Sequence, residues 1–486
     1  MTFNEAILSL LHYNEKMPLL FNSGIFLILF VFFLAIFMLV EKKQFLRVTW
    51  TLAFSLFFYY KSSGNYVLIL LISTLIDYTL GWMIFTAPSK AIKRVFLFLS
   101  LFANLGMLAY FKYTNFFIDT FNSLGASISS YEIFLPIGIS FYTFQTLSYS
   151  IDIYRGELKP TQNILDFAFF VSFFPQLVAG PIVRAADFLP QINKKIAVSN
   201  ADLTRATILI ASGLFKKAVI SDYISTNYVD RIFDNPALYS GFENLMGMYA
   251  YTLQIYCDFS GYSDMAIGLA LLMGFTLMEN FNAPYISKSI TEFWRRWHIS
   301  LSSWLKDYLY ISMGGNRKSK IRTYFNLFIT MLLGGLWHGA SWKFVFWGMM
   351  HGTALTAERF FKDRIKLPKT KWIAAFSMLL TFHFIAFCWI FFRASDFSNA
   401  LAVIKQISKG FNISVALEVV AAYRWVFLLI SIGFLMHFIP GTFHTYIEQR
   451  LERTPLLFKS FIITSVAWLA FQVNSGKIIP FIYFQF

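Results

Sequence analysis

The sequence predicts an all-α integral membrane protein. Of its 486 residues, 57% are hydrophobic and only 14% are charged, whereas soluble domains average about 25% charged residues. Residues 17–40 and 372–392 contain no Asp, Glu, Lys or Arg. A helix of ~20 such residues crosses the ~30 Å hydrocarbon core of a bilayer. We therefore expect a bilayer to be the solvent for much of this chain.

The chain opens with residues 1–11, which predict a short interfacial helix rather than a cleavable signal peptide, because no basic region or small-residue cleavage site is present. Residues 17–40 predict the first membrane helix. Other uncharged runs predict further spans, at residues 95–111, 372–392, 425–447 and 460–476. The whole pattern indicates roughly eleven to thirteen membrane helices, some of them re-entrant or interfacial.

Basic residues predict an orientation. They cluster after the first and third spans and again after the fifth, while the loop at residues 114–131 has only Asp119 as a charge. The positive-inside rule then places the N-terminus and this loop outside the cytoplasm. The apolar run 164–180 lies between two cytoplasmic basic regions, so it is expected to dip into the membrane and return. The net charge of +15 fits the same rule, although some cations are also expected to face an anionic cytosolic cofactor or anionic membrane lipids.

A single polytopic domain spanning residues 1–486 is the simplest organisation. The longest polar stretch, residues 361–371, predicts a cytoplasmic loop or a linker before the last spans. The chain shows no nucleic-acid motif, so no nucleic-acid partner is expected. The two cysteines give neither a disulfide framework nor metal-ligand spacing.

The segment at residues 291–317 predicts an amphipathic helix, because its large apolar side chains repeat at intervals of three and four: Trp294, Trp297, Leu301, Trp304, Tyr308 and Ile311. Arg295, Arg296 and His298 lie among these aromatics. They indicate either an interfacial helix with a structural histidine or part of a functional site.

A second candidate is His338, which lies between Trp337 and Gly339 in an apolar run at residues 332–352. A neutral imidazole with an ordinary pKa of about 6.5 can take a proton from a hydroxyl and return it to a leaving group. The alternative is a packed histidine bonded to a neighbouring helix. His351, thirteen residues further on, is expected to face elsewhere and to be structural.

The third candidate is the stretch 256–275, where Asp258, Ser260, Ser263 and Asp264 lie in apolar surroundings. They are expected either to bind substrate or to pair with Arg or backbone N–H groups around a broken helix. Several catalytic motifs are absent: a G-x-S-x-G elbow, a P-loop and H-E-x-x-H. Their absence counts against a serine hydrolase, an ATP-driven pump and a zinc protease.

Taken together, these stretches resemble the membrane-bound O-acyltransferase (MBOAT) family. The resemblance is carried by "FWRRWHISLSSWLKDYLY" with "GGNR", by "GGLWHGASW", "DFSGYSDMAIGL", "NFNAPY" and "FFPQLVAGPIVRAADFLPQ", and by the terminal "FIYFQF". It covers nearly the whole chain. Within the family, the chain is similar to the membrane subunits of bacterial alginate O-acetyltransferases and, more distantly, to the teichoic acid D-alanyl transferases.

The resemblance implies a ring of membrane helices around a central tunnel in the bacterial inner membrane. It also implies an acyl thioester donor on the cytoplasmic side, acetyl-CoA, and no metal. The family's two histidines correspond to His338, as general base, and His298, which would orient the thioester or stabilise charge on its carbonyl oxygen. The expected substrate-binding residues are Trp294, Arg295, Arg296, Trp297, Asp258, Asp264 and Asn282, with the arginines near the phosphates of coenzyme A.

The implied acceptor is an exported polysaccharide such as alginate, reached through a periplasmic acetyltransferase or acceptor protein, because the chain has no soluble domain that could hold a polymer. Two alternatives stay open at this point. One is a polysaccharide or lipid transporter without covalent chemistry, and the other is a lipid acyltransferase with a long-chain donor.

Overall fold

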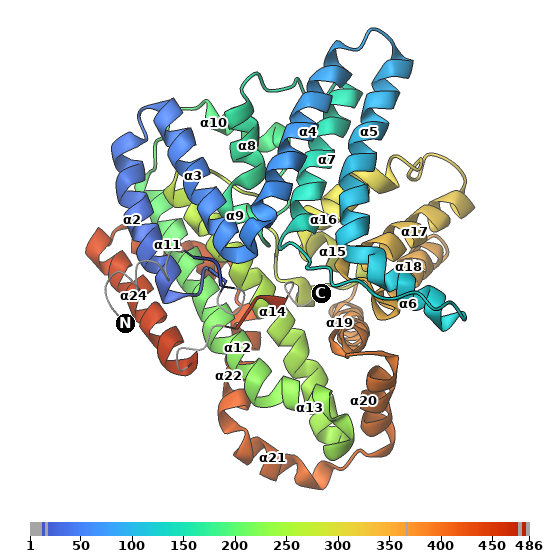
Figure 1. Cartoon of the computed structure of the whole chain (residues 1–486). Helices are drawn as coiled ribbons and strands as arrows, with labels where there is room; N and C mark the ends of the chain where they lie inside the picture. The colour runs from blue at the N-terminus through green and yellow to red at the C-terminus, as the bar shows by residue number, and fades with distance from the viewer. Residues whose placement is uncertain (1–11, 15–17, 366–367, 475–478, 483–486) are drawn as a thin grey trace. The chain divides into compact units, whose positions relative to one another are not determined.

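In the computed structural model, which describes residues 12–14, 18–365, 368–474 and 479–482, every regular element is helical (Figure 1). The prediction of an all-α protein is thereby confirmed. The interfacial helix predicted at residues 1–11 lies outside the described residues. The chain forms two compact units. The first runs to Ala206 and includes Met265–Met278, and the second comprises Thr207–Asp264 and Glu279–Phe486. The single domain expected over residues 1–486 stays a prediction.

The first unit contains most of the N-terminal helices. Their bounds are α2 (Gly24–Val40), α3 (Gln44–Ser63), α4 (Val67–Thr86), α5 (Lys90–Leu108), α6 (Thr114–Ser123), α7 (Ile139–Arg155), α8 (Ile164–Ser172), α9 (Phe174–Leu177) and α10 (Ala185–Ile192). Phe174 of α9 is fully buried, and its ring lies 5.1 Å from that of Phe54 and 5.7 Å from that of Phe33. The core of this unit is thus built largely from the abundant phenylalanines.

Helices α4, α5 and α7 pack against one another within the first unit (Figure 1). Their shared interface is polar at one point, where the buried carboxylate of Asp77 accepts hydrogen bonds from Ser100 Oγ at 2.7 Å and Asn104 Nδ2 at 2.9 Å. Ser150 of α7 donates to the same carboxylate. Hydrogen bonds of this kind hold apolar helices together where the hydrophobic effect alone does not.

The second unit contains the remaining helices, two of which lie partly in the first unit. Their bounds are α11 (Asn200–Leu214), α12 (Asp222–Ile224), α13 (Asp230–Asp234), α14 (Gly241–Leu272), α15 (Ile290–Arg296), α16 (Ile299–Trp304), α17 (Lys320–His338), α18 (Trp342–Lys362), α19 (Lys371–Arg393), α20 (Phe397–Lys409), α21 (Ala416–Ala422), α22 (Arg424–His437), α23 (Gly441–Glu452) and α24 (Leu456–Asn474). The unit boundaries within α11 and α14 fall at residues 206 and 264. In the part of the chain that the structure describes, four short π-helical turns interrupt the α-helices; the one that concerns the site is η7 (Leu305–Tyr310).

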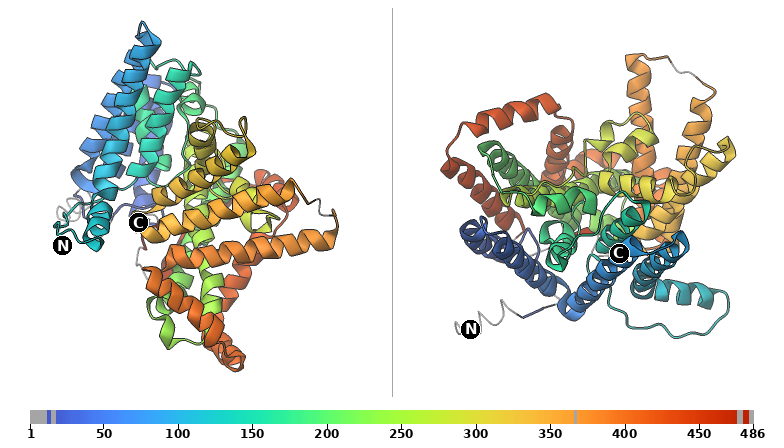
Figure 2. Two further views of the ribbon diagram at one scale, coloured as in Figure 1. Left: turned by 90° about the vertical axis from the view of Figure 1, so that its right-hand side faces the viewer. Right: turned by 90° about the horizontal axis from the view of Figure 1, so that it is seen from above.

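Helices α17, α18 and α19 form a stack in the second unit, drawn in orange tones in Figure 2. The closest approach is between α17 and α18, at Gly335 and Gly348. A Cβ at Gly335 would overlap the carbonyl oxygen of Phe344 and would lie 2.8 Å from the Cα of Gly348. Gly335 and Gly348 therefore allow close backbone contact, as small residues do between membrane helices.

Four apolar helical stretches among the described residues are long enough to cross a membrane: Gln44–Thr86, Lys90–Ser123, Lys371–Arg393 and Leu456–Val473. The pair α21 and α22, bent by 92°, would be a fifth. This number is lower than the eleven to thirteen spans that the sequence predicts. Several other helices, such as α7 and α14, bury many polar side chains and are not among these long apolar stretches. The larger count stays a prediction, as does the ring around a tunnel.

Two predicted helices have different courses in the structure. Residues 425–447 do not form one helix, because α22 ends at His437 and α23 begins at Gly441 after Pro440, which cannot continue a helix. The prediction of a broken helix at residues 256–275 is wrong as well, because α14 runs without interruption to Leu272. The helix predicted at residues 372–392 is confirmed as α19, which is long and apolar enough to cross a membrane.

Candidate functional site

The segment predicted as one amphipathic helix is in fact broken at His298. Helix α15 begins at the N-cap residue Ser289, whose Oγ accepts from the backbone N–H of Glu292 at 3.1 Å. It ends at Arg296, and α16 starts only at Ile299. His298 between them has a φ of 44°, a left-handed conformation that is uncommon for a residue with a Cβ. The periodic stripe predicted the helical content but not this break.

The neighbouring segment at residues 280–282 holds the break in place. The backbone N–H of Ile299 donates to the carbonyl of Asn280 at 2.9 Å, and the N–H of Asn282 donates to the carbonyl of Arg296 at 2.9 Å. These two bonds satisfy backbone groups that the interrupted helix leaves unpaired. A strained residue that its surroundings fix in this way is typical of a functional site.

The side chain of Asn280 also sets the state of the His298 ring. Its Oδ1 lies 3.1 Å from Nδ1 of His298 and accepts from Ser300 Oγ at 2.9 Å, while its Nδ2 donates to Ser263 Oγ at 3.1 Å. Because an amide oxygen only accepts, Nδ1 of His298 carries the hydrogen. The neutral ring then has its lone pair on Nε2.

His338 lies at the C-terminal end of α17, where the chain turns towards α18. Its side chain is 3% exposed and is packed among aromatic rings, with ring centroids 5.1 Å from Trp347 and 5.5 Å from Phe392. The following Gly339 leaves room for the ring of Phe344, which a Cβ at this position would overlap. The sequence "WHGASW" therefore makes a tight turn that presents a buried imidazole.

The structure brings the two predicted histidines together. The ring centroids of His298 and His338 are 6.4 Å apart, which is too far for a direct hydrogen bond but allows both rings to contact one reacting group. His298 is fully buried and lies outside the candidate membrane-spanning helices. Burial lowers its pKa to about 3, because desolvation penalises the imidazolium. His298 is therefore neutral at physiological pH.

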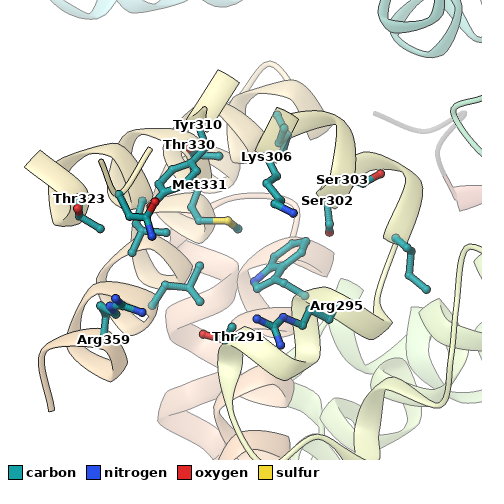
Figure 3. A pocket seen from close by; sticks show the side chains of 16 residues that line it. Thr291, Arg295, Ser302, Ser303, Lys306, Tyr310, Thr323, Thr330, Met331 and Arg359 are labelled. Carbon is teal, nitrogen blue, oxygen red and sulfur yellow. The ribbon is translucent and has the colours of Figure 1, made fainter. Parts of the chain in front are cut away.

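A pocket of about 440 Å³ is built from the same segment and from α17 and α18. Arg295, Lys306 and Arg359 lie on its wall with exposed side chains, and their nitrogens point into the same space (Figure 3). Trp294 and Met331 supply apolar surface to it. Three cations over an apolar wall can bind an anionic ligand that also has an apolar part.

The other predicted binding residues near this segment have different positions. Arg296 does not line the pocket: its Nη2 lies 3.0 Å from Glu292 Oε1, and its Nη1 donates to the carbonyl of Asn282 at 3.1 Å. Asn282 thus belongs to the backbone pairing that holds the break. Trp297 is fully buried, with its ring stacked at 5.6 Å on Phe293. None of these three residues lines the pocket; they pack or hydrogen-bond next to the residues that do.

Asp258 and Asp264 pair with lysines in the structure, whereas the sequence suggested arginines. Lys217 Nζ lies 2.5 Å from Asp258 and 2.7 Å from Asp222, and Lys216 Nζ lies 2.6 Å from Asp264. Asp258 also accepts from the backbone N–H of Ile482 at 3.0 Å, as expected for a carboxylate that meets backbone donors. A role of either aspartate in substrate binding stays a prediction.

Two residues of the site were missed at the level of sequence, Asn280 and Arg359, whereas Lys306 is one of the cations of the predicted segment at residues 291–317. Asn280 lies in the quoted "NFNAPY" stretch, but spacing alone does not reveal which of its two asparagines faces His298. Arg359 is 61 residues from His298 in the chain and reaches the pocket only because α18 packs against α15. Among the described residues, no group of three or more His, Cys, Asp or Glu side chains converges as a metal site would.

Comparison with known proteins bears on the activity. The model of the MBOAT, membrane-bound O-acyltransferase family matches residues 66–397. The chain is 43% identical over 396 residues to the "Probable alginate O-acetylase AlgI" of Pseudomonas aeruginosa, covering 79% of this chain and 73% of the relative. It is 38% identical over 423 residues to the peptidoglycan O-acetyltransferase of Helicobacter pylori, covering 80% and 79%.

A more distant similarity is to the teichoic acid D-alanyltransferase of Bacillus subtilis, 32% identical over 281 residues and covering 54% of this chain and 70% of the relative. All three relatives are named as acyl-transferring enzymes. The chain is an O-acyltransferase, and the transporter alternative is set aside. The matched region contains both buried histidines and the pocket, and the chain belongs to the membrane-bound O-acyltransferase (MBOAT) family.

Proposed function

We propose that this enzyme takes an acetyl group from cytoplasmic acetyl-CoA and passes it across the bacterial inner membrane to acetylate an extracytoplasmic polysaccharide such as alginate. The observation that carries this proposal is the convergence of two buried histidines in the same unit as a cation-lined pocket. The relatives named for O-acetylation of alginate and of peptidoglycan support acetyl as the acyl group.

The pocket is proposed to bind the donor. Arg295, Lys306 and Arg359 would contact the phosphates of coenzyme A, because cationic side chains form strong, charge-assisted hydrogen bonds to phosphate oxygens. Trp294 would contact an apolar part of the same ligand. No metal is invoked, since base catalysis by a histidine is sufficient for acyl transfer from a thioester.

In the proposed reaction, His338 acts as the general base. It takes the proton of the attacking hydroxyl, belonging to the acceptor or to a partner's nucleophile, as the oxygen bonds to the thioester carbonyl carbon. The carbon–sulfur bond then breaks, and the same proton passes to the thiolate to give free coenzyme A. His298 is proposed to orient the bound substrate: the lone pair on Nε2 would accept a hydrogen bond from an N–H or O–H group of that substrate. The tautomer fixed by Asn280 supports this orienting role rather than stabilisation of an oxyanion, which needs an N–H donor.

The polysaccharide is proposed to receive the acetyl group through a periplasmic acetyltransferase or acceptor protein. This part of the proposal is supported by the resemblance to the membrane subunits of alginate O-acetyltransferases, which implies that the acyl group is handed to an extracytoplasmic partner or acceptor. Capture of the detergent-solubilised enzyme, followed by identification of co-purifying periplasmic proteins, tests it. Direct acetylation of a glycan by the purified chain, with no partner bound, would argue against the two-protein scheme.

The test of the main proposal is transfer of radiolabelled acetyl from acetyl-CoA in proteoliposomes. Wild type is compared with His338→Ala and with His444→Ala, a matched control on the exposed α23. We expect the His338 variant to be slower by about 10²- to 10⁴-fold, as for loss of a positioned base, and the control to keep wild-type activity. Unchanged transfer by His338→Ala would refute the assignment of the base.

A further inference from the structure

A hydrogen bond behind the pocket wall links Trp294 to a histidine outside the proposed reaction. The indole Nε1–H of Trp294 donates to Nδ1 of His351 at 3.3 Å. Trp294 lines the pocket, whereas His351 is fully buried in α18 and does not. The two rings meet nearly edge-on, with centroids 5.2 Å apart. Sequence spacing alone assigns no role to His351.

The hydrogen bond also defines the tautomer of His351. Because an indole nitrogen can only donate, Nδ1 of His351 must carry its lone pair, and the neutral ring has its hydrogen on Nε2. This is the opposite tautomer from that of His298. The hydrogen-bond partners of the two buried histidines therefore fix different tautomers. His351 acts as a hydrogen-bond acceptor for a side chain of the pocket wall.

The surroundings of His351 keep its ring in one orientation. Its centroid lies 4.5 Å from that of Trp347 and 5.7 Å from that of Phe384. Trp347 in turn lies 5.1 Å from His338. A continuous row of packed rings thus runs from the pocket wall at Trp294 to the proposed base, and close-packed rings leave little freedom for any one of them to turn.

We propose that His351 is a positioning residue of this pocket: by accepting the indole N–H of Trp294 it holds that ring at the wall and so determines the affinity for the acyl donor. The inference rests on the proposed function, in which the pocket binds acetyl-CoA. A purely structural histidine would affect folding but not the donor KM. A positioning histidine raises the donor KM when its acceptor is removed, while kcat is largely kept.

The test compares donor KM and kcat of wild type, His351→Leu, His351→Asn and Trp294→Phe in proteoliposomes. The Asn side chain places an oxygen close to the position of Nδ1 and is expected to restore most of the wild-type KM. His351→Leu and Trp294→Phe each remove one side of the bond, and each is expected to raise the KM roughly three- to tenfold. The double variant should be little worse than either single one, because both remove the same interaction.

The matched control is His383→Leu. His383 also accepts from an aromatic donor, Tyr249 Oη, at 2.9 Å, but it is exposed on α19 and lies outside the pocket lining. It should leave the donor KM unchanged. A wild-type KM in His351→Leu, or additive effects in the double variant, would overturn the inference while the proposed function stands.

Failure of the proposed function would give a different experimental result from failure of this inference. Binding of coenzyme A to the purified wild type is measured directly by calorimetry, beside turnover of acetyl-CoA. If wild type neither binds coenzyme A nor consumes the thioester, the donor assignment falls, and the inference falls with it. If wild type binds coenzyme A and His351→Leu binds it three- to tenfold more weakly, the inference is supported even where the acceptor is missing from the assay.

Discussion

At the scale of single residues, Asn280 decides what His298 can do. Its side chain fixes the tautomer of the buried imidazole, and its backbone carbonyl holds the break between α15 and α16. Burial keeps His298 neutral, with a pKa of about 3. Protonation of His298 therefore does not contribute an acid limb to the activity of the wild type between pH 5 and 8.

Replacing Asn280 by Asp should change that behaviour. A carboxylate beside Nδ1 favours the imidazolium form and raises the pKa of His298. As the pH falls through the raised value, His298 gains a proton on Nε2 and loses the lone pair that orients the reacting group, so kcat should fall on the acid side. The measurement is kcat against pH for both proteins. Identical profiles would show that Asn280 does not control the protonation of His298.

The two neighbouring arginines are expected to behave differently. Arg295→Ala removes a cation from the pocket wall and should raise the KM for acetyl-CoA by about tenfold, the loss of one charge-assisted hydrogen bond. Arg296→Ala instead removes the bonds to Glu292 and Asn282, so it should lower the thermal stability and leave the donor KM unchanged. Steady-state kinetics with thermal unfolding of both variants separate the two roles. A higher KM in Arg296→Ala alone would reverse the assignment.

At the scale of elements, the contact between α17 and α18 depends on glycines that allow the backbones to touch. Gly335→Ala would push Phe344 and Gly348 away. We expect a loss of about 1–3 kcal/mol of stability, as for overpacking of a close contact, together with reduced activity, because His338 ends the same helix. Gly106→Ala is the matched control: a methyl added to this helical glycine would meet no neighbouring atom within 4 Å, and alanine there should stabilise by up to ~1 kcal/mol. Thermal unfolding in detergent measures both changes, and equal Tm values for the two variants would contradict the contact.

The sequence predicted helices well where interactions within the segment itself determine them. It predicted them less well where contacts with a separate segment of the chain determine where a helix breaks. An uncharged run was sufficient to predict α19, and the three–four spacing predicted the helical turns around His298. The break at His298 was not predictable, because it depends on Asn280, which comes from a separate segment of the chain. Pro440 is a local indication that α22 ends nearby. The prediction of one helix over residues 425–447 gave more weight to the absence of charged residues than to this proline.

The candidate site shows the same division. His298, His338, Trp294 and Arg295 were predicted from motifs, and the structure brings the histidines together and places Trp294 and Arg295 in the pocket. Arg359 became visible as a pocket residue only through the packing of α15 to α18. The selection of Arg295 over Arg296 also needed the structure, because adjacent residues on a helix face directions about 100° apart.

At the scale of the whole molecule, the distribution of basic residues predicts which loops face the cytoplasm. The native cysteines, Cys257 and Cys388, are both buried, so they contribute little background to labelling with a thiol reagent. A cysteine introduced at exposed Lys42 should be protected from an impermeant reagent added outside intact spheroplasts. One introduced at exposed Ser127, in the loop predicted to be external, should react. The opposite pattern would invert the predicted orientation.

The left-handed backbone at His298 has a consequence for how this position can change over evolutionary time. The proposed reaction requires histidine there, whereas the backbone, with a φ of 44°, is best suited to glycine or asparagine. A lineage that no longer needed the reaction would therefore be expected to drift to one of these two residues while keeping the fold. Among homologous genes, glycine or asparagine opposite His298 would mark copies that have lost the transferase and retained the scaffold.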